Sequence, residues 1–145
     1  SEDRLVFAPK VSHEKYLAQF RQADLFLDTF IYNAGATASN ALWAGLPVIT
    51  KSGQGYTARM AGSLLCSVGL PELVTKTSQE YEDLALKCAT VPTFLGSIKQ
   101  KLDRNRTTSP LFNTALFTRH LENGFQQANQ IFLRSEKPKV IYVPA

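Results

Sequence analysis

The sequence of 145 residues is poor in the residues that carry metal, redox or disulfide chemistry, with only two cysteines, two histidines and one methionine. Two cysteines make no zinc site without histidines close by. Cys66 and Cys88 each lie among apolar or small residues in an expected helix, which predicts two buried, reduced thiols. No Ser–His–Asp arrangement or metal-ligand spacing stands out. We therefore expect no metal, no cofactor and no disulfide.

Long apolar runs are also absent. No stretch is long enough to cross a bilayer, and no signal-peptide pattern opens the chain. These absences predict a soluble, cytoplasmic protein with no membrane partner. The chain opens at Ser1 without an initiator Met and enters an apolar run at once. We expect one domain over 1–145, cut from a longer chain and ending in a tail at 136–145.

The charge balance is mildly basic. The net charge of +4 comes largely from residues 99–106 and from Lys137 and Lys139. Such an excess is compatible with phosphate-bearing ligands or nucleic acid, and equally with ordinary solvated helix faces. Nucleic acid is the weakest of these alternatives, because no aromatic residue interleaves with the basic run at 99–106.

Apolar runs typical of buried strands occur at residues 4–8, 25–29 and 47–51. A helical pattern lies between successive runs. We therefore expect the α/β class, with a Rossmann-like parallel sheet flanked by helices.

The second half of the sequence is mainly helical in pattern. Residues 70–74 have the character of a turn followed by a short strand, and residues 140–143 have strand character without an obvious partner. The last helix has one broad apolar stripe, which predicts packing against a neighbouring domain or sheet. We expect helices over 12–23, 57–68, from 78, from 92, and over about 113–134.

The segment 33–37 joins an expected strand to an expected helix over 36–44, which Gly45 ends by adopting a left-handed conformation. The start of a helix offers free backbone N–H groups and a positive dipole end, and both favour an anion. We therefore expect a nucleotide phosphate at this point. Most strand–loop–helix turns of α/β domains bind nothing, so the pattern alone leaves both interpretations open.

Five collinear runs in the sequence are similar to those of one enzyme family: ADLFLDT, ALWAGLPVIT, GLPELV, EYEDLAL and SPLFNT. They resemble the C-terminal catalytic region of the O-linked N-acetylglucosamine transferases, a family that includes SPINDLY-type enzymes and bacterial relatives fused to tetratricopeptide repeats. The resemblance covers residues 4 to about 129. It implies most of the C-terminal half of a GT-B glycosyltransferase, the half that holds the donor nucleotide.

The resemblance also implies a set of site residues. The diphosphate would lie on the helix start, at Gly35, Ala36, Thr37 and Ala38. The ribose and base would lie among residues that come from an earlier helix and from the phosphate-binding helix: Val11, His13, Tyr16, Gln19 and Asn40. Catalytic side chains are not assigned, because the family supplies them from the other half of the enzyme.

The sequence departs from the family at several of these positions. Gly35 stands where His is usual, Ala36 where Thr is usual, and Asn40 where Asp is common. Tyr16 replaces a base-contacting His. Each lost hydroxyl or charged acceptor costs about 1–3 kcal/mol of binding. The Tyr16 ring can stack on a base, or it can face the core of an amphipathic helix.

Two other residues have alternative interpretations. Arg59 follows a glycine-rich loop and is a candidate phosphate contact, with a surface ion pair as the alternative. Asp28 ends a buried strand, where we expect it to cap backbone groups rather than act in acid–base chemistry.

Two functions therefore follow from the resemblance. In the first, the chain is the donor half of a protein O-glycosyltransferase that uses a nucleotide sugar, UDP-linked rather than GDP-linked, and a protein acceptor with Ser or Thr hydroxyls. Its partners would be the N-terminal half and the helical repeats of the same chain, and the fragment alone would turn over nothing. In the second, the nucleotide site has decayed and the domain is kept as a protein-interaction module.

Overall fold

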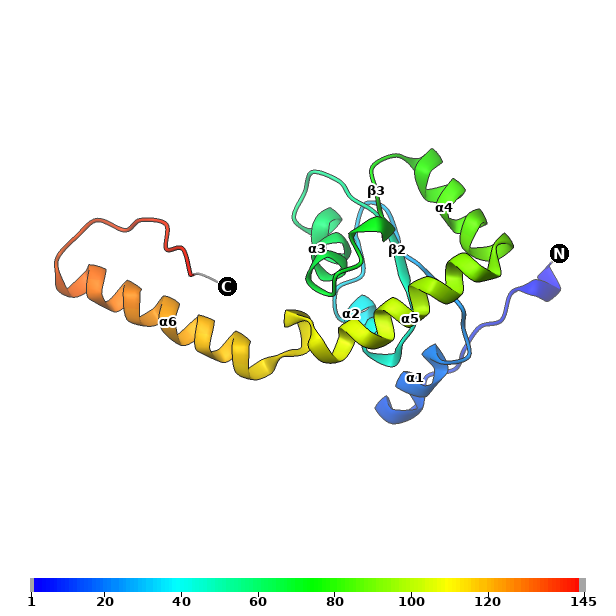
Figure 1. Cartoon of the computed structure of the whole chain (residues 1–145), viewed down its shortest axis with the longest axis horizontal. Coiled ribbons are helices and arrows are strands. Elements are labelled where there is room, and N and C mark those ends of the chain that lie inside the picture. The colour runs from blue at the N-terminus through cyan, green and yellow to red at the C-terminus, as the bar shows by residue number, and fades with distance from the viewer. Residues whose placement is uncertain (1, 144–145) are drawn as a thin grey trace.

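The computed structural model describes residues 2–143 and is built around a small parallel sheet (Figure 1). The three strands lie in the order β1-β2-β3. Phe26 pairs with Val48, and Thr50 pairs with Val74. The strands are short: β1 is Phe26–Leu27, β2 is Val48–Lys51 and β3 is Val74–Thr75. The expected α/β class with a parallel sheet is confirmed.

Helices make up most of the remaining structure. The α-helices are α1 (His13–Phe20), α2 (Ala36–Ala44), α3 (Met60–Ser67), α4 (Ser78–Thr90), α5 (Pro92–Thr108) and α6 (Thr114–Leu133). Short 3-10 helices are η1 (Glu2–Arg4), η2 (Thr57–Arg59), η3 (Pro71–Leu73) and η4 (Pro110–Phe112). No helix in the part of the chain that the structure describes is long and apolar enough to cross a membrane.

The central strand β2 divides the core into two clusters, because successive side chains of a strand point to opposite faces. Val48 belongs to the larger cluster, which α2, α3 and α5 build, and Ile49 belongs to a smaller one with Tyr81 and Cys88 of α4. Leu42 and several other residues of the larger cluster are fully buried. The β2 strand is therefore covered by helices on both faces, as an interior parallel strand requires.

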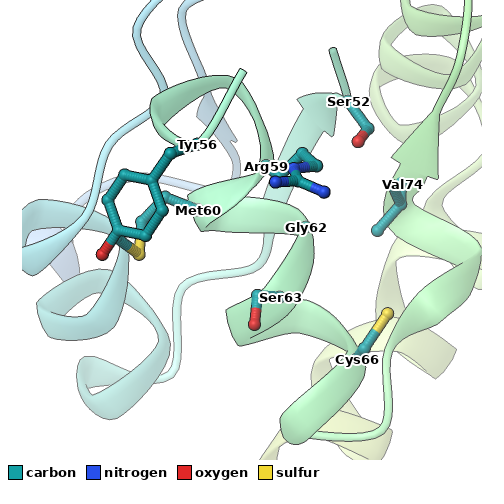
Figure 2. A pocket seen from close by; sticks show the side chains of 8 residues that line it. All are labelled: Ser52, Tyr56, Arg59, Met60, Gly62, Ser63, Cys66 and Val74. Atoms are coloured by element: carbon teal, nitrogen blue, oxygen red, sulfur yellow. The ribbon is translucent and has the colours of Figure 1, made fainter. Parts of the chain in front are cut away.

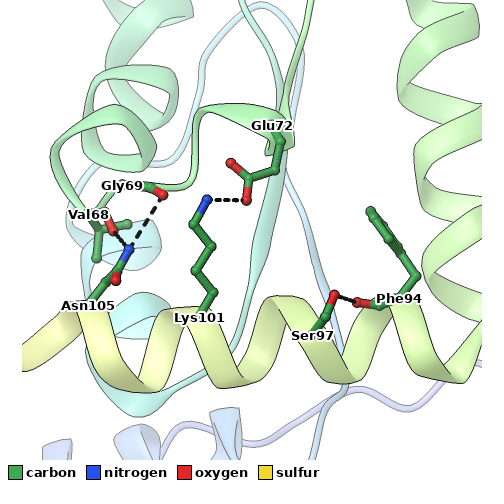
Figure 3. Close-up of polar contacts among 7 residues, drawn as sticks. All are labelled: Val68, Gly69, Glu72, Phe94, Ser97, Lys101 and Asn105. Carbon is green, nitrogen blue, oxygen red and sulfur yellow. Dashed lines mark hydrogen bonds and ion pairs between the residues drawn. The ribbon is translucent and has the colours of Figure 1, made fainter.

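Helix α5 is held against the turn between α3 and η3 by polar contacts (Figure 3). The Asn105 Nδ2 donates to the Val68 carbonyl at 2.8 Å, and Lys101 pairs with Glu72 at 2.6 Å. Gly69 in this turn has a φ of +74°, and a Cβ there would lie 2.7 Å from the Asn105 Nδ2. The left-handed backbone favours glycine at this position, and any side chain here would also displace the Asn105 amide.

The strand predicted at residues 4–8 is wrong. Residues 5–12 form no regular element, and Val6 and Phe7 are each 90% exposed. A strand is stabilised by its neighbour in a sheet, and no strand pairs with this segment among residues 2–143. The third strand of the sheet is β3, in the region where the sequence predicts a turn followed by a strand.

Helix α6 extends away from the sheet (Figure 1). The Asn113 side chain caps it by accepting from the Leu116 N–H at 2.9 Å. Its predicted apolar stripe includes Phe117, Phe125 and Phe132, which are 64%, 66% and 77% exposed. Residues 140–143 form no strand, so their strand character is not realised.

The two cysteines differ in exposure. Cys88 is 1% exposed, and burial raises the pKa of its thiol, as expected for a buried, reduced cysteine. Cys66 is exposed, so its predicted burial is wrong. It lies on the side of α3 that faces away from the core, whereas Leu65 beside it is fully buried.

Candidate functional site

The start of α2 leaves three backbone N–H groups free. The first backbone hydrogen bond at this end of the helix runs from the Ser39 N–H to the carbonyl of Gly35, the residue before α2, at 3.0 Å. The N–H groups of Ala36, Thr37 and Ala38 precede it, and within residues 2–143 no side chain caps them. Ala36 and Thr37 are exposed, whereas the Ala38 side chain is fully buried. Ala38 can therefore contribute only its backbone to a ligand.

A buried carboxylate fixes the loop that leads into α2. Asp28 is 4% exposed and accepts two hydrogen bonds, from the Ala34 N–H at 2.7 Å and from the Thr50 hydroxyl at 2.6 Å. The Asp28 N–H donates to the Ile49 carbonyl at 3.1 Å. The prediction that Asp28 caps backbone groups is confirmed, and its role is to tie the end of β1 to β2 and to the loop.

Asn33 ties the same loop to η2. It is 1% exposed, and its Nδ2 donates to the Thr29 carbonyl at 2.7 Å, while its N–H donates to the Thr57 carbonyl at 3.2 Å. Its Oδ1 has no partner among the described residues. The position of the α2 start thus depends on two buried polar side chains, of which sequence reasoning identified only Asp28.

A pocket in front of α1 brings together four of the predicted ribose and base residues. It has a volume of about 560 Å³ and is lined by Ala8, Pro9, Lys10, Val11, His13, Tyr16 and Gln19. We call it the Tyr16 pocket. The Tyr16 ring lines it and also meets the Phe20 ring edge-on, with 4.9 Å between centroids. The contact with Phe20 agrees with the packing interpretation of Tyr16, and stacking on a base stays a prediction. Lys10, which the sequence reasoning did not single out, also lines this pocket.

Asn40 lies half-buried one turn into α2 and lines neither the Tyr16 pocket nor the pocket at Arg59. Helices α1 and α2 pack against each other, so Asn40 belongs to the helix next to the Tyr16 pocket. The predicted ribose contact of Asn40 stays a prediction.

Arg59 lies in a separate pocket (Figure 2). This pocket, which we call the Arg59 pocket, has a volume of about 510 Å³ and is lined by Ser52, Tyr56, Arg59, Met60, Gly62, Ser63, Cys66 and Val74. Met60 is its closest link to α2, because a Cβ on Gly35 would lie 3.5 Å from the Met60 Cγ. Among residues 2–143 no carboxylate pairs with Arg59, so the surface ion pair that was its alternative is not formed.

Comparison with known proteins identifies the family of this chain. The model of glycosyl transferase family 41 matches residues 1–121. The chain belongs to glycosyl transferase family 41. The resemblance found in the sequence is thereby confirmed.

Family 41 relatives are similar to this chain over most of its length. A UDP-N-acetylglucosamine–peptide N-acetylglucosaminyltransferase of Caenorhabditis elegans is 33% identical over 83% of the chain and 10% of the relative. The probable enzyme SEC of Arabidopsis thaliana is 28% identical over 94% of the chain and 14% of the relative. The chain therefore spans a small part of the curated relatives it matches.

A solved structure supports the fold of this family 41 chain. The O-GlcNAc transferase of Thermobaculum terrenum, as a K341M mutant, aligns with a TM-score of 0.76 and 32% identity, over 81% of this chain and 22% of that one. This structural likeness agrees with the expected Rossmann-like, GT-B fold. Within residues 2–143 the family 41 chain holds no group of three or more His, Cys, Asp or Glu side chains that could bind a metal ion.

Proposed function

We propose that this chain is the donor-nucleotide half of a protein O-glycosyltransferase. The parent enzyme would transfer an N-acetylglucosamine-like sugar from a nucleotide diphosphate sugar to Ser or Thr hydroxyls. The observation that carries the proposal is the row of three free N–H groups at the start of α2, in a chain of a glycosyltransferase family. A UDP-linked donor is favoured over a GDP-linked one, because the relatives are named for UDP-N-acetylglucosamine.

The chemistry assigned to α2 is stabilisation of the diphosphate leaving group. When the sugar departs, negative charge grows on the diphosphate, and N–H donors fixed in advance stabilise it. Backbone donors need no particular side chain, so the changes at Gly35 and Ala36 leave them in place. The exposed Thr37 supplies a hydroxyl at the same point. Asp28 and Asn33 hold the loop, so these donors are arranged before the ligand arrives.

The Tyr16 pocket would receive the base and ribose. Its Tyr16 ring, which also contacts Phe20 edge-on, would offer a stacking surface for the base. Lys10 in its wall adds a positive charge for a nucleotide. The catalytic side chains, the N-terminal half and any helical repeats belong to the longer parent chain in this proposal, so we expect the 145-residue chain to bind nucleotide without turning over a sugar donor.

Titration of the chain with UDP and then GDP, followed by backbone amide shifts, tests this function. We expect saturable shifts at 35–40 and around Tyr16, with UDP binding more tightly. Tyr16→Leu should weaken UDP about tenfold through lost stacking, whereas Tyr142→Leu on the tail, where the ring is 84% exposed, should change nothing. Amide shifts that occur elsewhere but not at the α2 start would contradict the proposal.

Restoring the residue usual in the family sharpens the test. A Cβ at position 35 would meet only the Met60 Cγ, at the ordinary contact distance of 3.5 Å. Gly35→His should therefore be accommodated and should tighten UDP binding severalfold, by adding a phosphate donor worth about 1 kcal/mol. A matched Gly96→His, where a Cβ meets nothing within 4 Å, should leave the affinity unchanged.

The second candidate is a decayed domain kept for protein interaction. The departures at Gly35, Ala36, Asn40 and Tyr16 favour it, and the exposed stripe on α6 would supply a contact surface. Under this function neither nucleotide shifts any amide up to millimolar concentration, in the wild type or in Gly35→His. Titration of both the wild type and Gly35→His therefore distinguishes a weakened nucleotide site from a lost one.

A further inference from the structure

The Arg59 pocket has a chemistry of its own, distinct from the α2 start. Met60 and Val74 are its apolar lining residues, and Tyr56 adds a ring that is 73% exposed. The other groups are hydrogen-bond donors: the Arg59 guanidinium and the Ser52 and Ser63 hydroxyls. In Figure 2 Met60 and Tyr56 lie on one side, and the Arg59 guanidinium lies between them and Val74. No acidic side chain lines the pocket.

The positive charge in this pocket is uncompensated. Across residues 2–143 no carboxylate lies within ion-pair distance of Arg59. The chain as a whole carries 16 Lys and Arg against 12 Asp and Glu. A guanidinium matches both carboxylate and phosphate with two parallel hydrogen bonds. The apolar side chains that line the same pocket favour a carboxylate on a short apolar stem over a bare phosphate.

The pocket lies beside the segment assigned to the diphosphate. Met60 in its wall reaches to contact distance of position 35. The loop before α2 is bound to η2 through the Asn33 N–H and the Thr57 carbonyl, at 3.2 Å. A group in the Arg59 pocket therefore sits next to the helix start, on the edge of the sheet where β1 and β2 end.

We propose that the Arg59 pocket binds an acidic side chain of the acceptor peptide, with the Arg59 guanidinium and the Ser52 hydroxyl on the carboxylate and Val74 against its methylene groups. The role of this peptide as an acceptor rests on the proposed function, whereas the carboxylate site rests on the pocket alone. The consequence is a preference for acceptor peptides with Glu or Asp near the modified hydroxyl.

Cys66 supplies a built-in reporter for this pocket. It lines the pocket and is exposed, whereas Cys88 is 1% exposed and burial raises the pKa of its thiol. Alkylation by iodoacetamide, followed by mass spectrometry, should therefore modify Cys66 first. We expect a short peptide with a serine between Glu residues to slow the alkylation of Cys66 saturably. The same peptide with Gln in place of Glu should need about a tenfold higher concentration for equal protection.

Two variants assign the preference to Arg59. Arg59→Gln should remove the difference between the Glu and Gln peptides, and Arg59→Lys should restore part of it. Arg104→Gln removes the same charge from an exposed position on α5 and should keep the full difference. Equal protection by the two peptides in the wild type, or a preference that survives Arg59→Gln, would overturn the proposal.

UDP titration of the same samples separates this proposal from the proposed function. UDP shifts at the α2 start without Glu-dependent protection would leave the nucleotide function standing and overturn the acidic-peptide site. Glu-dependent protection of Cys66 without UDP shifts would support the carboxylate site and remove the reason to call the peptide an acceptor.

Discussion

The chain has a packed body, from α1 to η4, and two described ends that pack little, residues 3–12 and 114–143. In the body, Leu42 and Leu102 are fully buried. At the two ends, Phe7 and Phe132 are 90% and 77% exposed. Apolar side chains are present in all these regions, so composition does not separate them. The difference is whether a second element of the described chain lies against them.

The two apolar runs at residues 4–8 and 25–29 show this most directly. In the second run, the Phe26 N–H donates to the Pro47 carbonyl at 2.8 Å, and β1 forms beside β2. The first run has the same kind of side chains and no paired strand among residues 2–143. An apolar run thus indicates that a segment needs a partner, and only the fold shows whether the partner is there.

A pair of leucine truncations gives the largest expected contrast between body and ends. Leu42→Ala in the core should lower the free energy of unfolding by about 2–5 kcal/mol, because it removes buried methyl groups and leaves a cavity. Leu133→Ala on α6, where the side chain is 71% exposed, should leave it nearly unchanged. Urea unfolding of both variants measures the contrast, and a comparable loss at Leu133 would show that α6 is covered in solution.

A pair of carboxylate substitutions should give a smaller contrast. Asp28→Asn replaces one acceptor oxygen with an NH₂ group, so either the Ala34 N–H loses its acceptor or the Thr50 hydroxyl must turn to accept from the amide, and both bonds lose the carboxylate charge. We expect a loss of about 1–3 kcal/mol, because the site is buried. Glu136→Gln breaks an exposed pair with Lys139 near the chain end and should cost nothing measurable. Equal urea midpoints for the two variants would contradict the role given to Asp28.

The sequence predicts best where the signal is local. Helix α2 spans the predicted residues, and Gly45 after it has a φ of +89°, because small residues and a terminal glycine specify a helix and its end. The Tyr16 pocket was foreseen only through the family resemblance. Three features were not predictable: the burial of Asn33, the exposure of Cys66 and the place of Arg59 in a pocket of its own beside the α2 start. Each depends on how α3 and η2 pack against the sheet.

Tyr81 offers the smallest and most selective test, through pH. Burial raises the pKa of this phenol above its ordinary value of 10.0, and the nearby Asp28 carboxylate raises it further. The neutral phenol is therefore favoured in the folded state, so its contribution to stability is complete below pH 10.0 and is lost as the pH rises through the higher folded pKa. We expect the urea midpoint to fall over this range.

Tyr81→Phe isolates this effect from the titration of other groups. The variant loses the hydrogen bond from the Tyr81 hydroxyl to the Asp28 carbonyl, at 3.0 Å, and should be less stable at neutral pH. Its midpoint should fall less steeply than that of the wild type above pH 10.0, because the raised pKa is gone. Tyr142→Phe on the exposed tail should retain the wild-type slope. Equal slopes in wild type and Tyr81→Phe would mean that the body does not bury this phenol in solution. The contrast between body and ends would then be weaker at α4 than the packing of Tyr81 with Ile49 of β2 implies.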